Sequence, residues 1–177
     1  MAKNDRGFTL IELIVVIAIL GIMAAVIAMS PTVAAAARAR SCAVQLTDQI
    51  ARCRIICLSH SGDNNYITIH RANDGSYVVE TFLNGTSAGT DTISGRGVSL
   101  SYADNGDYVI GNTAAGDKTS AYLITEPAKL GFSRGTGALK YDCGMANSNA
   151  DLVFTVSGGG RSYKITVTRS TGAITRS

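Results

Sequence analysis

A single charged side chain, Glu12, interrupts an apolar N-terminal segment, whereas the rest of the chain is rich in charged and turn-forming residues. The apolar run covers residues 8–29. As a helix it is about 33 Å long, enough to cross the hydrocarbon core of a bilayer. We therefore expect a transmembrane helix over residues 8–30. The short, slightly basic segment 1–7 is expected to stay on the cytoplasmic side of the membrane.

A cleavable secretory signal peptide is the competing interpretation of this run. The apolar part of a signal peptide is usually shorter, although the small residues at 34–37 would suit a cleavage site after it. Glu12 favours a different explanation, because a carboxylate in a membrane segment is costly and is usually kept for a function. The alternative for Glu12 is that its side chain simply reaches the headgroups and has no further role.

The start of the run carries a motif that resembles the class III leader of type IV pilins and type II secretion pseudopilins: Arg6-Gly7-Phe8-Thr9-Leu10-Ile11-Glu12, followed by the apolar residues 13–22. In that family a prepilin peptidase cuts after the glycine and N-methylates the new terminus. The resemblance implies cleavage between Gly7 and Phe8, methylation of Phe8, and loss of residues 1–7 as a leader.

The same resemblance implies a role for Glu12 in assembly. In the family this carboxylate is thought to neutralise the terminal amine of a neighbouring subunit. Such a pairing is physically reasonable, because opposite charges attract strongly only where water is absent. The partners implied are other pilin or pseudopilin subunits, the prepilin peptidase, the membrane, and the assembly ATPase and membrane platform of the machine.

Helical periodicity continues beyond the apolar run, over residues 31–60. Pro31 removes one backbone donor and is expected to kink the helix just before it. The stripe that should pack on a sheet recurs every three or four positions, at Ala39, Cys42, Leu46, Ile50, Cys53 and Cys57. The polar residues of this amphipathic segment should lie mostly away from the stripe, at Arg40, Gln45, Asp48, Arg52 and Arg54.

After residue 60 the period changes from helical to two. Short strands separated by turn residues indicate antiparallel pairing, because a parallel crossover needs about a dozen residues or more. Residues 61–177 should therefore form an antiparallel β-sheet or small β-sandwich, which makes the protein α+β. Residues 84–97, rich in Gly, Thr and Ser, are expected to be a loop. The expected strands are 66–71, 76–83, 98–103, 108–110, 121–125, 130–133, 138–141, 152–157, 162–169 and 173–175.

This half has a second, looser resemblance. H-type minor pseudopilins, and related small minor pilins, have a helix followed by an antiparallel β-domain. They often contain a segment similar to residues 130–137 and end in a hairpin similar to residues 163–167 followed by 171–174. The resemblance favours that subfamily.

The four cysteines, Cys42, Cys53, Cys57 and Cys143, allow two interpretations. In an exported domain, a disulfide from Cys143 to Cys53 or Cys57 would tie the sheet to the helix. The other interpretation is four small, buried free thiols. A bond between Cys53 and Cys57, one helical turn apart, would distort the helix. A zinc site formed by Cys53, Cys57, His60 and Cys143 is not expected, because no paired C-x-x-C spacing is present.

No feature of the sequence is typical of an enzyme. Ser59 and His60 are adjacent but lack a placed acid, and there is no P-loop or dinucleotide fingerprint. The turn at residues 104–107 lacks the full ligand spacing of a calcium loop. A net charge of +3 is small for a dedicated nucleic-acid binder. We expect no cofactor, no metal and no nucleic-acid partner.

The sequence as a whole thus predicts a non-enzymatic structural subunit, a minor pseudopilin or pilin, of a type II secretion pseudopilus or type IV pilus. It would be a single-pass protein of the inner membrane with its C-terminal domain outside the cytoplasm, and later part of a fibre. A major type IV pilin with an adhesive or DNA-binding role is one alternative. A membrane-tethered binding domain or enzyme with a coincidental leader is the other.

Overall fold

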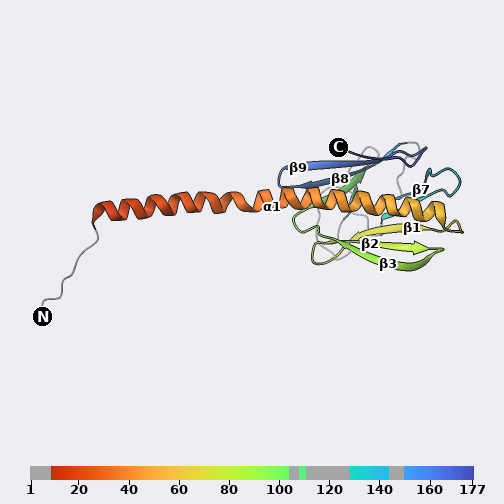
Figure 1. Ribbon diagram of the computed structural model, residues 1–177, viewed down its shortest axis with the longest axis horizontal. Helices are drawn as coiled ribbons and strands as arrows, with labels where there is room; N and C mark the ends of the chain where they lie inside the picture. The colour runs from red at the N-terminus through yellow and green to blue at the C-terminus, as the bar shows by residue number, and fades with distance from the viewer. Residues whose placement is uncertain (1–8, 104–107, 111–127, 144–149) are drawn as a thin grey trace.

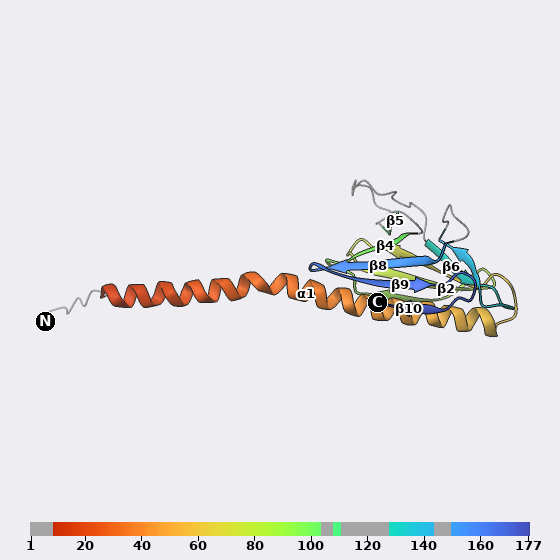
Figure 2. The same cartoon turned by 90° about the horizontal axis from the view of Figure 1, so that it is seen from above.

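A long helix leads into an antiparallel β-domain (Figure 1). The computed structural model describes residues 9–103, 108–110, 128–143 and 150–177. The helix, α1 (Leu10–Ser59), projects its N-terminal half away from the domain and lays its C-terminal half against it (Figures 1 and 2). The strands are β1 (Tyr66–Arg71), β2 (Tyr77–Leu83), β3 (Thr86–Ile93), β4 (Ser99–Ala103), β5 (Tyr108–Val109), β6 (Ala128–Phe132), β7 (Leu139–Asp142), β8 (Leu152–Gly158), β9 (Arg161–Val167) and β10 (Ile174–Arg176).

The helix is continuous from cap to cap. It begins after Thr9, whose side chain caps the first turn, and ends where the His60 amide donates to the Ile56 carbonyl oxygen at 3.0 Å. It passes through Pro31 without a break in the helical assignment, so the lost donor there does not end the helix. The sequence therefore placed both ends of the helix to within about two residues, the usual scatter at helix termini.

The described strands form two five-stranded sheets in which each pair of neighbouring strands is antiparallel, as the close strand spacing predicted. One sheet has the order β3-β2-β1-β6-β7 and the other β10-β9-β8-β4-β5. The expected strand at 121–125 and the turn at 104–107 lie outside the described residues.

Residues 84–97 are not simply a loop, which corrects the prediction. They contain β3, which pairs with β2 through a two-residue turn at Asn84 and Gly85. Both turn residues have positive φ, 52° and 82°, which is the geometry that closes a tight hairpin. β3 is exposed along nearly its whole length, with only Ile93 buried. An exposed edge strand needs no apolar alternation, so its composition looks like that of a loop.

The core lies where α1 and the two sheets meet. All six residues of the predicted stripe are buried, and Leu46 and Ile50 have no exposed surface. Each sheet turns one face of alternating apolar residues toward them. Arg40, Gln45, Asp48 and Arg52 are exposed, as predicted, whereas Arg54 is half-buried and donates to the Thr171 carbonyl oxygen at 3.0 Å.

Polar groups connect the two sheets. The Tyr77 hydroxyl on β2 donates to the Val98 carbonyl oxygen at 3.1 Å and accepts from the Leu100 amide at 2.9 Å. The Tyr102 hydroxyl on β4 donates to the Cys143 carbonyl oxygen at 2.9 Å. Both rings are buried, so these bonds satisfy hydroxyls that would otherwise be costly in the core.

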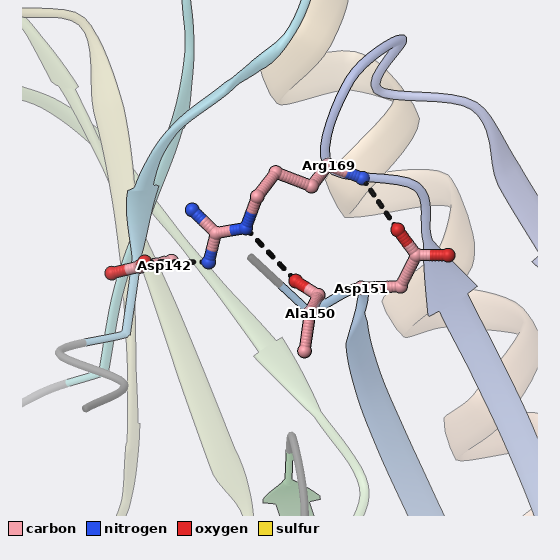
Figure 3. A network of polar contacts seen from close by, with 4 residues as sticks. All are labelled: Asp142, Ala150, Asp151 and Arg169. Atoms are coloured by element: carbon pink, nitrogen blue, oxygen red, sulfur yellow. Dashed lines mark hydrogen bonds and ion pairs between the residues drawn. The ribbon is translucent and has the colours of Figure 1, made fainter. Parts of the chain in front are cut away.

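Arg169 makes a further connection between segments of the β-domain (Figure 3). Its guanidinium donates to Asp142 at the end of β7, at 2.7 Å, and to the Ala150 carbonyl oxygen at 2.9 Å. Its backbone amide donates to the Asp151 carboxylate at 2.9 Å. The ion pair is only about one-fifth exposed on both sides, so it is better shielded than a surface pair.

Candidate functional site

The first turn of α1 holds the one charge of the apolar segment in a defined position. The Glu12 carboxylate accepts hydrogen bonds from the Thr9 amide and the Thr9 hydroxyl, both at 3.0 Å. The Glu12 amide donates to the Thr9 hydroxyl oxygen at 3.3 Å. This is a capping box, which satisfies amide groups that a helix start leaves without partners. The geometry keeps the carboxylate at the very beginning of the helix.

The N-terminal part of α1 is apolar and exposed. Its large apolar side chains from Leu10 to Met23 are each at least 50% exposed. A continuous apolar surface of this kind is rare on a protein that has no partner, and it marks a surface that contacts something else. Within the part of the chain that the structure describes, no helix qualifies as long and apolar enough for a membrane crossing. Gly7 and Phe8, the predicted cleavage and methylation positions, lie outside the described residues.

The structure places the four cysteines in the core as free thiols, so the bridge from Cys143 to Cys53 or Cys57 is not formed. The Cys53 and Cys57 thiols contact other groups instead. Their Sγ atoms lie 3.9 Å apart, Cys53 contacts the Leu130 carbonyl oxygen at 3.7 Å, and Cys57 contacts the Asn65 carbonyl oxygen at 3.2 Å. Cys143 follows β7, where its amide donates to Lys129 and its carbonyl accepts from Tyr102.

The environments of the thiols shift their pKa values in different directions. The hydrogen bond from Cys53 lowers the pKa of Cys57 to about 7, and the same bond together with burial raises the pKa of Cys53. Burial raises the pKa of Cys42 to about 11, and it also raises the pKa of Cys143. Three of the thiols are therefore protonated and unreactive near neutral pH, and access to Cys57 is limited because only 2% of the residue is exposed.

Cys53, Cys57, His60 and Cys143 do not form a metal-binding cluster. Among the described residues no group of three or more His, Cys, Asp or Glu side chains is arranged to hold a metal ion. His60 is exposed at the end of α1, where its Nδ1 lies 3.2 Å from the Ser59 hydroxyl. The structure thus gives these residues a role in packing and helix termination.

Two loops that sequence reasoning treated separately lie against each other beside α1. A Cβ atom on Gly172 would collide with the Gly137 carbonyl oxygen, and the Arg54 guanidinium lies next to both glycines. Gly137 has a φ of 70° and Gly172 a φ of 62°, so both are positive. The contact was not predicted, and the only signal for it was the glycine at each turn, since close backbone approach needs a residue without a side chain.

Comparison with known protein families finds a motif that includes the first turn of the helix. The family model of the prokaryotic N-terminal methylation motif matches residues 2–28. Beyond this motif, the chain shows no significant similarity to a curated protein or to a solved structure. The matched stretch contains the motif from Arg6 to Glu12 and much of the exposed apolar part of α1. This match supports the resemblance of the leader to that of type IV pilin and pseudopilin precursors.

Proposed function

We propose that the protein is a structural subunit of a type II secretion pseudopilus or type IV pilus, and within that class a minor pseudopilin. The observation that carries the proposal is the methylation motif, which covers the start of a helix with two different halves. The first half exposes its apolar side chains, and the second half is buried in a folded β-domain. These two properties are expected of a subunit that is first held in a membrane and then packs into a fibre.

In this proposal residues 8–30 anchor the precursor in the inner membrane as a single span. The short basic leader stays in the cytoplasm and the β-domain lies outside it. The exposed side chains from Leu10 to Met23 support the anchor, because lipid or neighbouring helices would remove them from water. A prepilin peptidase then cuts between Gly7 and Phe8 and methylates the amine of Phe8.

Glu12 pairs with the amine of Phe8 from a neighbouring subunit. Its carboxylate accepts two bonds from Thr9 through one oxygen, and an ionised carboxylate has about four acceptor positions in all. Capacity therefore remains for an incoming ammonium. Before a neighbouring subunit arrives, the hydrogen bonds from Thr9 also stabilise the Glu12 carboxylate. They therefore reduce the free-energy cost of holding its charge in the membrane.

The H-type assignment is supported by the two segments that resemble that subfamily. Residues 130–137 and 171–174 are far apart in sequence, but their turns pack on each other against Arg54. They therefore belong to one structural unit beside the helix. The chain itself supplies packing surface, while the assembly ATPase and the membrane platform supply the work and the site of assembly.

The processing step is tested by the intact mass of the protein extracted from membranes. The mature chain should begin at Phe8 and carry one added methyl group. A bulky residue at the cleavage position, in Gly7→Val, should leave the full-length precursor, while Gly7→Ala serves as the matched control and should be processed. A mature chain that begins near residue 35 would instead show an ordinary secreted protein.

Abundance in purified fibres tests the minor role. Quantitative mass spectrometry of sheared fibres should find this chain in far fewer copies than a second pilin-like protein. If this chain is the main component of the fibre, it is a major pilin and the H-type assignment fails.

A further inference from the structure

A groove lies between the middle of α1 and the β8–β9 hairpin, with a volume of about 720 Å³. Its α1 side is built from small and apolar residues, among them Val33, Ala37 and Val44. Arg40 from α1 and Arg161 from β9 line the groove, and together with Arg176 from β10 they also line an adjoining hollow, so this rim is cationic. An apolar floor beside a cationic rim suits an amphiphile with an anionic head.

Within the described part of the chain, the groove brings no acidic side chain to the three arginines. Among the described residues, no Asp or Glu lines the groove, although Ser177 at the end of the chain does. The ion pairs that the described residues form involve Arg52 and Arg169, neither of which lies here. Three exposed guanidinium groups without a compensating carboxylate side chain attract an anion, and they repel one another until one binds.

The position of the groove indicates which anion it meets. The hairpin turn packs on α1 just beyond the apolar run, since a Cβ on Gly159 would collide with the Thr32 carbonyl oxygen and the Ala36 amide. Thr32 is about 4.5 Å further along the helix axis than Met29, and Ala36 about 10 Å further. The headgroup layer of a bilayer is about 5–7 Å deep on each side. The hairpin therefore lies at the outer edge of the headgroups when residues 8–29 span the membrane.

Two details of the groove fit this depth. Arg40 lies further from the membrane than the hairpin turn. Its long side chain leans toward the start of the helix, which shortens the distance from its guanidinium to the headgroups. Tyr163, half-buried, lines the groove beside Arg161. Tyrosine is enriched at membrane interfaces, where its ring lies at headgroup level.

We infer that this groove binds the phosphate headgroups of anionic phospholipids in the outer leaflet of the inner membrane and holds the β-domain against the membrane before assembly. The inference rests on the membrane anchor of the proposed function. It gives the stored subunit a fixed orientation of its domain. Extraction into a fibre then breaks the headgroup contacts and frees the groove.

The test uses the full-length chain with the substitution Tyr163→Trp, because the sequence contains no other Trp. The protein is reconstituted in phosphatidylcholine vesicles, either pure or with about one-third phosphatidylglycerol as the anionic lipid. Quenching of the Trp by a headgroup spin-labelled lipid should be several-fold stronger in the anionic vesicles. At about 1 M salt, where the Debye length is about 3 Å, the difference should largely disappear.

Matched substitutions locate the effect. In the reporter background, Arg40→Gln, Arg161→Gln or Arg176→Gln should each weaken the headgroup association about fivefold, and the triple variant should behave as in neutral vesicles. Arg52→Gln, on another face of α1, should behave as the parent does. Equal quenching in neutral and anionic vesicles would overturn the inference without any need for a variant.

Flotation of the vesicles separates this inference from the proposed function. If the chain floats with both kinds of vesicle and the quenching is the same in both, the anchor stands and the lipid site fails. If the chain does not float with either, the anchor fails and the lipid site fails with it. If quenching instead rises with the number of protein molecules per vesicle at a fixed fraction of anionic lipid, the groove binds a carboxylate surface of a second subunit, and the lipid site is wrong.

Discussion

The first half of α1 is apolar and the second half is amphipathic, and the two lie in different surroundings. From Leu10 to Met23 the large apolar side chains are at least half exposed, whereas the stripe from Ala39 to Cys57 is at most 2% exposed. The second half has its partner within the chain, because two sheets cover it. The first half has none among the described residues, so its apolar surface is free for lipid and for other subunits, as the proposed function requires.

The comparison also shows why a single uninterrupted helix suits both tasks. A helix of 50 residues is about 75 Å long, far longer than the β-domain needs. Because the helix is continuous, it places Glu12 far from the domain at its other end.

The largest expected effect comes from placing a charge in each half. Leu46→Asp should destabilise the β-domain by more than about 4 kcal/mol, because an unpaired carboxylate would be buried between α1 and both sheets. Leu20→Asp should change the unfolding free energy of the domain by less than about 0.5 kcal/mol, since this side chain is 59% exposed. Denaturant unfolding of the full-length variants in detergent measures both. Equal effects would mean that the halves fold as one unit.

Glu12 tests the exposed half through assembly. Glu12→Ala should reduce incorporation into fibres about tenfold or more, with no change in the melting of the β-domain, because the charge and the carboxylate's half of the capping box are both lost. Glu12→Gln keeps the capping geometry and removes only the charge. Pull-down from sheared fibres measures incorporation. If the Gln variant assembles normally, the cap matters and the pairing with a neighbouring amine is wrong.

Gly159 marks the boundary between the halves. Gly159→Ala should cost about 3 kcal/mol, because the residue has φ of 59° and its new Cβ would meet the backbone of α1. Gly160→Ala is the matched control. Gly160 also has positive φ, 77°, but has open space around it, so the change should cost only about 1 kcal/mol. Similar losses for both variants would show that the hairpin does not pack closely on the helix.

A smaller effect is expected on the outer face of the buried half. Arg52 and Asp91 form an ion pair at 3.5 Å whose side chains are 65% and 50% exposed. Arg52→Ala should therefore change the stability of the domain by less than about 0.5 kcal/mol. A loss comparable to that of Leu46→Asp would mean that the buried face of the helix is assigned wrongly.

No effect at all is expected from a reducing agent. Because the four thiols are free, dithiothreitol should leave the melting temperature of the β-domain unchanged. Four thiols per chain should react after denaturation without reductant. A count of two, with a lower melting temperature after reduction, would restore the bridge from Cys143 to the helix.

The edge strand β3 shows where reading the sequence failed although a signal was present. Its residues are polar and small because solvent covers them, so hydrophobic alternation is absent. Asn84-Gly85 is nevertheless a strong signal for a two-residue hairpin turn. By contrast β1, β8 and β9 were predicted nearly to the residue, because each has one buried face and so shows the period of two.

The sequence by itself determined the features that depend on local order along the chain. The methylation motif at residues 2–28 is a linear pattern, and the stripe from Ala39 to Cys57 follows from the 3.6-residue period of the helix. The tertiary structure alone decided which distant segments meet. It divided the strands into two sheets, turned Cys53 and Cys57 toward carbonyl groups of other segments instead of Cys143, and brought Arg40, Arg161 and Arg176 to one groove. Such contacts depend on strand order and on packing between segments, as between Cys53 and Leu130, which are 77 positions apart, and no local pattern in one sequence encodes them.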